Sequence, residues 1–325
     1  MNQENFLLSK RAEALKDDIV FVDLRIDYAF KLIFGTPGNE DLLLLLLDSI
    51  LPEKHIRSVE LASTDQVGDS PLGRKSIYDI RCTAECGEFV VEMQFERQDD
   101  FADRMVFYSS FPLRSRLLKG GDSYKLTPLY IIGILDFILP EVESNDEAIN
   151  HYMIRSKKGI SLTEGLHYVT VELPKISRDL HKLESRAEKL FYTIKNIGKM
   201  KSVPEELNGI GFEKIFEITK FAAMDNKTQE EYLAEFMAEM DARSQLRTAR
   251  NDGLEEGEAI GLEKGEAIGL GKGRKEGQEK GEAIGREEGR LEAKLETAKN
   301  LKSMSLSIEA IAAATGLTED QVRQL

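Results

Sequence analysis

The sequence has few cysteines, no long apolar run and no excess of positive charge. Its two cysteines, Cys82 and Cys86, exclude a disulfide framework and a four-thiolate zinc site, and they fit a reducing cytosol. The longest apolar run, Leu42 to Leu47, is too short to span a bilayer, and the first residues lack the pattern of a secretory signal. We therefore expect a cytoplasmic protein with no membrane segment.

Acidic residues outnumber basic ones by 58 to 44, so the net charge is -14. A chain of this charge repels the DNA backbone overall, and any nucleic-acid contact must be local. The 325 residues suffice for one substantial domain and an appendage. We expect a lead-in over 1–19, the main domain over 20–245, a helical spacer over 246–295 and a small C-terminal helical module over 296–325.

Residues 76–96 predict a β-hairpin. Two runs rich in β-branched and aromatic residues flank Cys86 and Gly87, which read as the tight turn and would place Asp79 opposite Gln94. Because successive residues of a strand point to opposite faces, the hairpin has one apolar and one polar face. The apolar face collects Tyr78, Ile80, Cys82, Phe89, Val91, Met93 and Phe95, and the polar face collects Asp79, Arg81, Glu92, Gln94 and Glu96.

The polar face brings two carboxylates together. In this register Asp79 and Glu92 are diagonal neighbours, roughly 7 to 8 Å apart at the backbone. That spacing suits a shared Mg2+ ion, or Mn2+ in its place, since Mg2+ takes oxygen ligands at about 2.0 to 2.1 Å and keeps several waters. The alternative is a solvated charged face on which Arg81 and Glu96 form a cross-strand pair, and the spacing alone leaves both open.

Helical patterns precede the hairpin. Apolar spacing predicts one helix over 23–35 and a second, leucine-rich and buried, over 40–51, with Asn39 as its N-cap. Glu40, in the first turn of the second helix, either favours the helix dipole or serves as an outer carboxylate near the metal.

A central sheet flanked by helices is expected for residues 20 to about 240, so this region should form a single α/β domain. Residues 129–137, LYIIGILDF, read as a strand buried on both faces. Further strands are expected over 55–62, 152–155 and 168–173, and helices over 99–119, 179–197, 210–220 and 230–246. Pro112 should kink or end the helix that contains it.

Basic residues gather on the helix over 99–119 and just beyond it. They form either an ordinary solvated helix face or a surface that contacts phosphate. The set consists of Arg104, Arg114, Arg116, Lys119 and Lys125.

Four of these elements in order resemble the PD-(D/E)XK nuclease family transposases, also called the Rpn recombination-promoting nucleases. The elements are Asp27-Tyr28-Ala29-Phe30-Lys31 with Ile33-Phe34-Gly35, then Asp79, then Glu92 with Gln94, then LYIIGILDF. The resemblance implies a restriction-endonuclease-like core, Mg2+-dependent hydrolysis of DNA phosphodiester bonds, and an association with recombination or mobile elements.

In this resemblance Asp79 and Glu92 match the metal-binding acids, and Gln94 falls where the broader superfamily usually has lysine. A glutamine orients water only through neutral hydrogen bonds, so activity is expected to be weak unless another cation assists. Lys31 either supplies that charge, next to Asp27 in the same motif, or is a helix-surface lysine. The alternative function is a catalytically silent relative that acts as an oligomeric interaction or DNA-binding scaffold.

Glycine recurs every fourth residue from Gly253 to Gly289. Each interior glycine costs a helix roughly 0.8 to 1 kcal/mol relative to alanine, so ten cost on the order of 8 to 10 kcal/mol. The residues between them favour helix, which leaves a self-associating helix or a solvated tether as the two interpretations.

The last residues, from Ser307 to Leu325, predict two short helices. Ser307 and Thr318 are their N-caps, and Gly316 separates them. The pattern resembles half of a helix-turn-helix domain, but the second helix offers only Arg323 as a DNA-seeking cation, which favours a small packing or dimerisation module.

Overall fold

The computed structural model describes residues 11, 13–63, 65–66, 76–97, 100–117, 126–140 and 145–325. The chain forms two compact units, Met1–Ser244 and Gln245–Leu325. Among the described residues, no helix combines the length and the apolar character needed to cross a bilayer.

The first unit is built on a six-stranded mixed sheet in the order β1-β4-β5-β6-β8-β7. The strands β5, β6 and β8 run parallel at its centre, and antiparallel pairs complete both sides. Their bounds are β1 Glu60–Leu61, β4 Ile80–Ala84, β5 Gly87–Gln94, β6 Leu129–Leu135, β7 Ile149–Met153 and β8 Leu166–Glu172. A separate two-stranded sheet joins β2, Asp65–Gln66, to β3, Ser76–Ile77.

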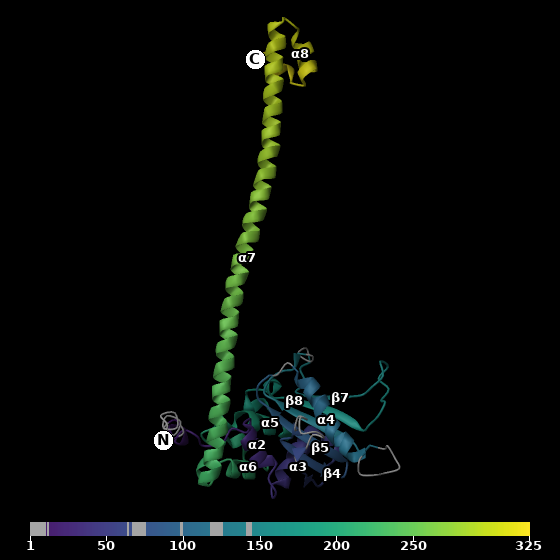
Figure 1. The fold of residues 1–325 in the computed structure, drawn as a ribbon, viewed down its shortest axis with the longest axis vertical. Helices are drawn as coiled ribbons and strands as arrows, with labels where there is room; N and C mark the ends of the chain where they lie inside the picture. Colours follow the sequence, from purple (N-terminus) through teal and green to yellow (C-terminus); the bar gives the residue numbers. More distant parts are fainter. Residues whose placement is uncertain are drawn as a thin grey trace. The chain divides into compact units, whose positions relative to one another are not determined.

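Helices cover both faces of the sheet, so the unit has three layers (Figure 1). The larger apolar cluster joins one face to four helices: α2 Asp27–Phe34, α3 Glu40–Ile50, α5 Arg186–Asn196 and α6 Glu213–Ile218. The smaller cluster joins the other face to α4, Phe101–Leu117. Short 3-10 helices lie at Pro52–Lys54, Leu173–Lys175, Leu180–Lys182, Ile197–Lys199, Glu205–Leu207 and Phe221–Ala223.

The central strand β6 carries no charged residue, because both of its faces are covered. Every residue of β6 is buried, as the run LYIIGILDF predicts. At Gly133 an added Cβ would lie 2.8 Å from the Phe101 ring, so the absence of a side chain lets α4 pack closely on the strand.

The hairpin forms, but its turn and register differ from the expected ones. The turn consists of Glu85 and Cys86, and Ile80 lies opposite Val91, a shift of two residues. Gly87 belongs to β5, where an added Cβ would lie 2.6 Å from the Pro128 carbonyl oxygen. The glycine is therefore needed for the approach of the segment before β6, a tertiary contact that the local sequence does not reveal.

The two-residue shift keeps the alternation of faces, yet the second face is not solvated. Glu88 and Glu92 are both buried, because the α4 layer covers this face. Arg81 pairs with Glu88 at 2.6 Å, whereas Glu96 pairs with Arg243 of a later helix, so the expected pair of Arg81 with Glu96 is wrong.

The expected place of Tyr78 on the apolar face of the hairpin is also wrong. Tyr78 precedes β4, packs in the α4 cluster, and its hydroxyl donates to the Tyr108 carbonyl oxygen. The bend at Asp79 separates it from the regular alternation of β4.

Three local expectations also change. The strand expected over 55–62 shrinks to β1, and α4 continues through Pro112 to Leu117 rather than ending there. Asn39 precedes α3 but makes no side-chain capping bond, since its amide donates instead to the Leu32 carbonyl oxygen. The bounds of these helices and strands thus depend on packing in the folded chain more than on local sequence signals.

The C-terminal unit contains most of a single long helix and two short ones. Helix α7 spans Asn226–Ser303, α8 spans Ile308–Thr315 and α9 spans Glu319–Arg323. Both predicted caps form: Ser307 accepts from Ala310 N–H, and Thr318 forms a reciprocal capping box with Gln321. Gly316 ends α8 in the left-handed conformation, at φ 68°. Ala298 of α7 packs with Ile311, Leu317 and Val322 as a small apolar core.

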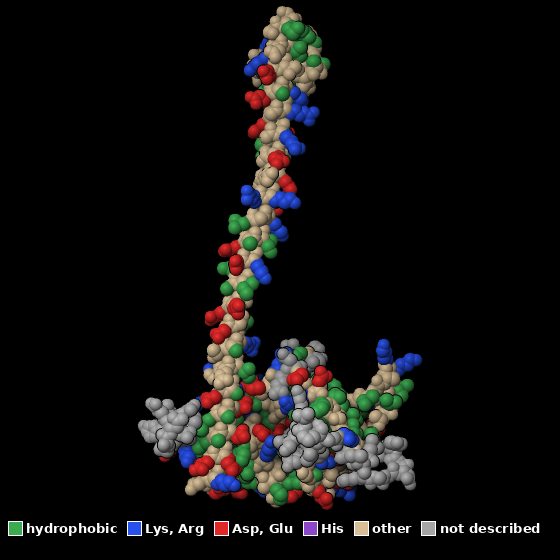
Figure 2. Space-filling model, in the orientation of Figure 1, with side chains coloured by type: hydrophobic (Ala, Val, Ile, Leu, Met, Phe, Trp, Pro, Cys, Tyr) green, Lys and Arg blue, Asp and Glu red, His purple; other side chains and the backbone are tan. Residues whose placement is uncertain are grey.

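Between the two ends of α7, charged side chains of both signs and apolar side chains stand out from the helix (Figure 2). Leu262 and Leu270 are 69% and 76% exposed. A Cβ added at any of the recurring glycines would meet no atom of the described residues within 4 Å. No contact in the described part of the chain therefore requires their small size.

Candidate active site

Asp79 and Glu92 lie face to face at the start of the hairpin. Asp79 occupies the bend before β4, and Glu92 lies on β5 with 2% of its surface exposed. The Met93 N–H donates to Asp79 Oδ2 at 2.7 Å, and the Asp79 N–H approaches Glu92 Oε1 at 3.4 Å. The observed register therefore brings the two acids closer than the diagonal arrangement expected from the sequence.

Both carboxyl groups are held in a setting that disfavours their charged forms. Burial, followed by the nearby charge of Asp27, raises the pKa of Asp79 to about 7. Burial, followed by the charge of Asp79, raises the pKa of Glu92 well above its usual value. Such a pair gains stability from a cation that lies between the two carboxylates.

Lys31 and Asp27, both from α2, form one wall of this pocket. The Lys31 ammonium lies 2.6 Å from Asp27 Oδ2 and 3.2 Å from Asp79 Oδ1. Burial lowers the pKa of Lys31, but the charges of Asp79 and Asp27 outweigh it and the pKa is raised. Lys31 is thus a charged group at the site. Its distance of four residues from Asp27 is also the spacing of an ordinary ion pair on a helix surface.

Helix α4 supplies Arg104 and Tyr108 from the other side. An Arg104 guanidinium nitrogen lies 4.0 Å from Glu92 Oε2, and the group packs over the rings of Phe101 and Tyr108. Burial and the charge of Glu92 raise the pKa of Tyr108, which keeps its hydroxyl protonated. The helix therefore presents one cation and one hydroxyl donor to the acids.

Gln94 lies at the end of β5, where the strand meets a pocket of about 440 Å³. The pocket is lined by Arg25, Asp27, Lys31, Asp79, Glu92, Met93, Gln94, Phe95, Glu96, Arg104, Tyr108 and Glu239. Asp27 and Lys31 of the first motif thus meet Asp79, Glu92 and Gln94 in one cavity, whereas no residue of LYIIGILDF lines it.

Sequence reasoning missed the residues that close the pocket beyond Gln94. Arg25 is held by Asp23 at 2.6 Å and by Asp136 at 2.7 Å, and it packs on the Phe95 ring. Arg243 of α7 packs on the same ring. The proximity of Arg25 to the DYAFK motif was a usable signal, whereas nothing local connects α7 to this site.

Other candidates lie elsewhere. Glu40 accepts from the Gly38 N–H at the start of α3 and does not line the pocket among the described residues. Arg114 is exposed on α4, ten residues and about 15 Å along the helix from Arg104. Only the backbone is described for Arg116, and Lys119 and Lys125 lie outside the described residues.

The donor set fits a hard cation such as Mg2+. Within the described part of the chain, no three side chains among His, Cys, Asp and Glu gather as a ready-made metal cluster. Asp79 and Glu92 would therefore hold the ion with help from water and neutral oxygens, the pattern that Mg2+ favours in proteins.

A mixed sheet covered by helices on both faces, with one such acid on β5 and the other in the bend before β4, is consistent with the PD-(D/E)XK nuclease fold. The model of the PD-(D/E)XK nuclease family transposases matches residues 24–249, and the chain belongs to this family. The resemblance found in the sequence is thereby confirmed. Neither a curated protein nor a solved structure matches the chain.

Family membership associates the chain with nuclease activity and mobile elements. Nucleases of this class generally use divalent metal ions, and the class implies DNA as the substrate.

Proposed function

We propose that the protein is a Mg2+-dependent DNA endonuclease whose site is the pocket around Asp79 and Glu92. The observation that carries the proposal is the opposition of these two buried acids, each with a raised pKa, in a cavity that is also lined by the cationic side chains of Arg25, Lys31 and Arg104. Burying two like charges together is costly unless a cation joins them. Membership of a nuclease family supports a metal ion as that cation, because nucleases of this class generally use divalent metal ions.

Each side chain of the pocket has a distinct role in this proposal. Asp79 and Glu92 hold the ion, which when bound lowers the pKa of a water and polarises the phosphate. The Gln94 amide orients that water. Lys31 and Arg104 face the scissile phosphate and stabilise the negative charge that grows on its oxygens.

Lys31 is the cation that we propose in place of the superfamily lysine. Gln94 carries no charge, whereas the Lys31 ammonium already lies 3.2 Å from Asp79. Asp27, as the second partner of Lys31, holds the ammonium in the pocket. An ammonium on α2 can thus act on Asp79, before β4, and on Glu92 of β5 without a lysine on the strand.

The test is cleavage of supercoiled plasmid with Mg2+ or Mn2+, by the full chain and by Asp79→Ala and Glu92→Ala variants. We expect nicking that EDTA and either substitution remove. Glu60→Gln, which removes an exposed acid on the neighbouring strand β1, is the matched control and should cleave normally. Folded protein that cleaves with neither metal would instead favour the silent scaffold.

The role of Lys31 has its own test. Lys31→Ala should lower the cleavage rate by about 10- to 100-fold, as expected for loss of one charge that stabilises the transition state. Lys31→Arg should restore part of the rate, and Gln94→Lys in the Lys31→Ala background should restore more. A rate unchanged by Lys31→Ala would assign this lysine to the surface of α2.

We also propose that α7 self-associates. Its exposed leucines and isoleucines find no partner among the described residues, and the open space beside its glycines permits close approach of a second helix. Light scattering over a range of concentrations tests this: a mass that stays monomeric from micromolar upwards would contradict it. The two free cysteines, Cys82 and Cys86, remain our basis for proposing a cytoplasmic location.

A further inference from the structure

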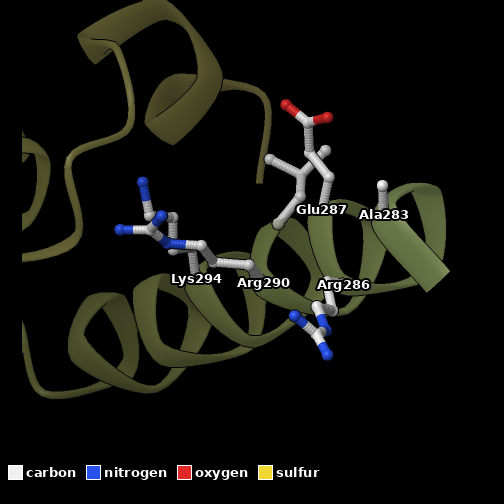
Figure 3. Close-up of a pocket in the computed structure, with 6 residues that line it drawn as sticks. Ala283, Arg286, Glu287, Arg290 and Lys294 are labelled. Atoms are coloured by element: carbon white, nitrogen blue, oxygen red, sulfur yellow. The ribbon is translucent and has the colours of Figure 1, made fainter. Parts of the chain in front are cut away.

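A second pocket lies in the C-terminal unit, beside the last turns of α7. It measures about 550 Å³ and is lined by Ala283, Arg286, Glu287, Arg290, Leu291 and Lys294 (Figure 3). Arg290 and Lys294 point their charged ends in the same direction, away from Arg286 (Figure 3). In a chain of net charge -14, this pocket concentrates three cations and only one acid.

The charges of this segment are sorted onto different sides of the helix. Arg286, Arg290 and Lys294 are spaced by four residues and follow one row, whereas Glu288, Glu292 and Glu296 follow a row about 200° away. A helix stabilised by its own ion pairs would place opposite charges four residues apart. Over residues 286–296, beyond the pair of Glu282 with Arg286, each row repeats one sign, which costs stability instead.

Arg290 and Lys294 also lack the partners that would neutralise them. Arg286 reaches Glu282 at 3.9 Å, but neither Arg290 nor Lys294 forms an ion pair with any residue that the structure describes. Lys294 extends to the turn between α8 and α9, where its ammonium lies 3.3 Å from a Cβ placed on Gly316. The carbonyl dipoles at the end of α8 favour that one cation, and they leave Arg290 uncompensated.

We infer that Arg290 and Lys294, with Arg286 at the rim, form a second DNA-contacting site that binds phosphates of the nucleic-acid backbone. The row repeats its charge about every 6 Å along the helix, which suits a ligand that repeats its own negative charge rather than a single small anion. Helix α9 offers one cation, Arg323, and this residue is already paired with Glu319 and Asp320. The C-terminal unit thus contacts DNA through α7, which supplies every residue that lines the pocket among the described residues.

The experiment measures binding of a fluorescent duplex to the full chain in EDTA, over a series of salt concentrations. Arg290→Gln with Lys294→Gln should flatten the slope of log affinity against log salt by about 1.8, since each lost phosphate contact removes about 0.9. Affinity near 0.1 M salt should fall by roughly 10- to 60-fold. Glu292→Gln with Glu296→Gln alters two charges on the opposite side and should not flatten the slope.

Charge rather than shape is the expected determinant, so Arg290→Lys with Lys294→Arg should keep the wild-type slope. Equal affinity and slope for the glutamine variant and the wild type would overturn the inference. A change in molecular mass with no change in DNA binding would do the same, because it would assign the cations to a protein partner.

This site is separable from nuclease activity. Binding in EDTA requires neither a metal nor Asp79, and it can be repeated in the Asp79→Ala background. A protein that cleaves but binds DNA without regard to Arg290 and Lys294 would refute this inference alone. One that binds through them and never cleaves would refute the proposed nuclease alone.

Discussion

The two units of this chain place charged and apolar side chains in opposite ways. In the first unit, acids such as Asp23, Glu88 and Glu92 are buried against specific partners, and the apolar residues form a continuous core. Along the middle of α7, leucines and isoleucines such as Leu262, Ile268 and Leu270 are exposed, and the charged residues recur with the helical repeat. Electrostatics in the first unit therefore depends on burial and protonation, whereas in the second it depends on solvent and salt.

The strongest test of this contrast removes charge from the buried pair. Asp79→Asn and Glu92→Gln should each lower the cleavage rate by about a thousandfold or more. Each removes a ligand of the metal ion, and that ion stabilises the transition state by several kcal/mol. The same variants should make the metal-free protein more stable at pH 8, by about 1 to 3 kcal/mol, because the repulsion between two buried carboxylates is relieved. Urea unfolding followed by tyrosine fluorescence measures this, since all nine tyrosines lie in the first unit.

If both variants lost cleavage and also lost stability, the acids would be structural rather than functional. Arg290→Gln, whose charge is exposed, should leave urea unfolding of the first unit unchanged.

Substituting glycine by alanine should have opposite signs in the two regions. At Gly198 an added Cβ would lie 2.6 Å from Asp23 Cβ and 2.8 Å from its Cα, so Gly198→Ala should destabilise the first unit by about 1 to 3 kcal/mol. At Gly261 no described atom lies within 4 Å of such a Cβ, and Gly261→Ala should stabilise the helix by roughly 0.8 to 1 kcal/mol.

Thermal unfolding by circular dichroism and hydrogen exchange along α7 distinguish the two effects. A loss of stability on Gly261→Ala would show that a partner helix packs against that glycine, and would sharpen the proposal of self-association.

A pH dependence of stability should belong to the first unit alone. The pKa of Asp79 rises from 3.8 to about 7 in the folded chain, so between these values the folded state binds more protons than the unfolded state. The metal-free protein should therefore lose stability as pH rises through this window, with at most about 1.4 kcal/mol per pH unit from this group.

The affinity for the metal ion should instead increase with pH, because the ion binds the carboxylates only after they have lost their protons. Below pH 7, stabilisation by Mg2+ and the cleavage rate should both increase with pH, by up to about tenfold per unit for one proton. Asp79→Asn should reduce the trend in stability, and the part that remains comes from buried Glu92. DNA binding through Arg290 and Lys294 should stay constant over the same range, since arginine and lysine keep their charge there. A matching pH dependence of both activities would contradict the separation of the two sites.

Much of the first unit could be anticipated from local patterns. The buried strand at residues 129–137, the leucine-rich helix and, in the second unit, the caps at Ser307 and Thr318 follow from apolar runs and capping residues, because these signals act within a few neighbours. The pairing of Asp79 with Glu92 was also foreseeable, since a two-residue slip of the hairpin keeps both acids on one face.

Other features depended on contacts between segments distant in sequence. The turn at Glu85 and Cys86 could not be predicted locally, because Gly87 serves the packing of β6 rather than the turn. Arg25 and Glu239 line the candidate active-site pocket only once the segments that carry them have folded beside β5. The short length of β1 likewise has no local signal.

By itself, the sequence determined the family, the two acids, the presence of Gln94 in place of a lysine and the periodic tail, because each of these depends only on residue types and their spacing. Only the tertiary structure decided that Lys31 stands beside Asp79, that burial raises the pKa of both acids, and that the Lys294 ammonium reaches Gly316 at the end of α8. The physical reason is that burial, desolvation and the meeting of charges from separate elements exist only in the folded chain, whereas periodicity and composition exist already in the unfolded one.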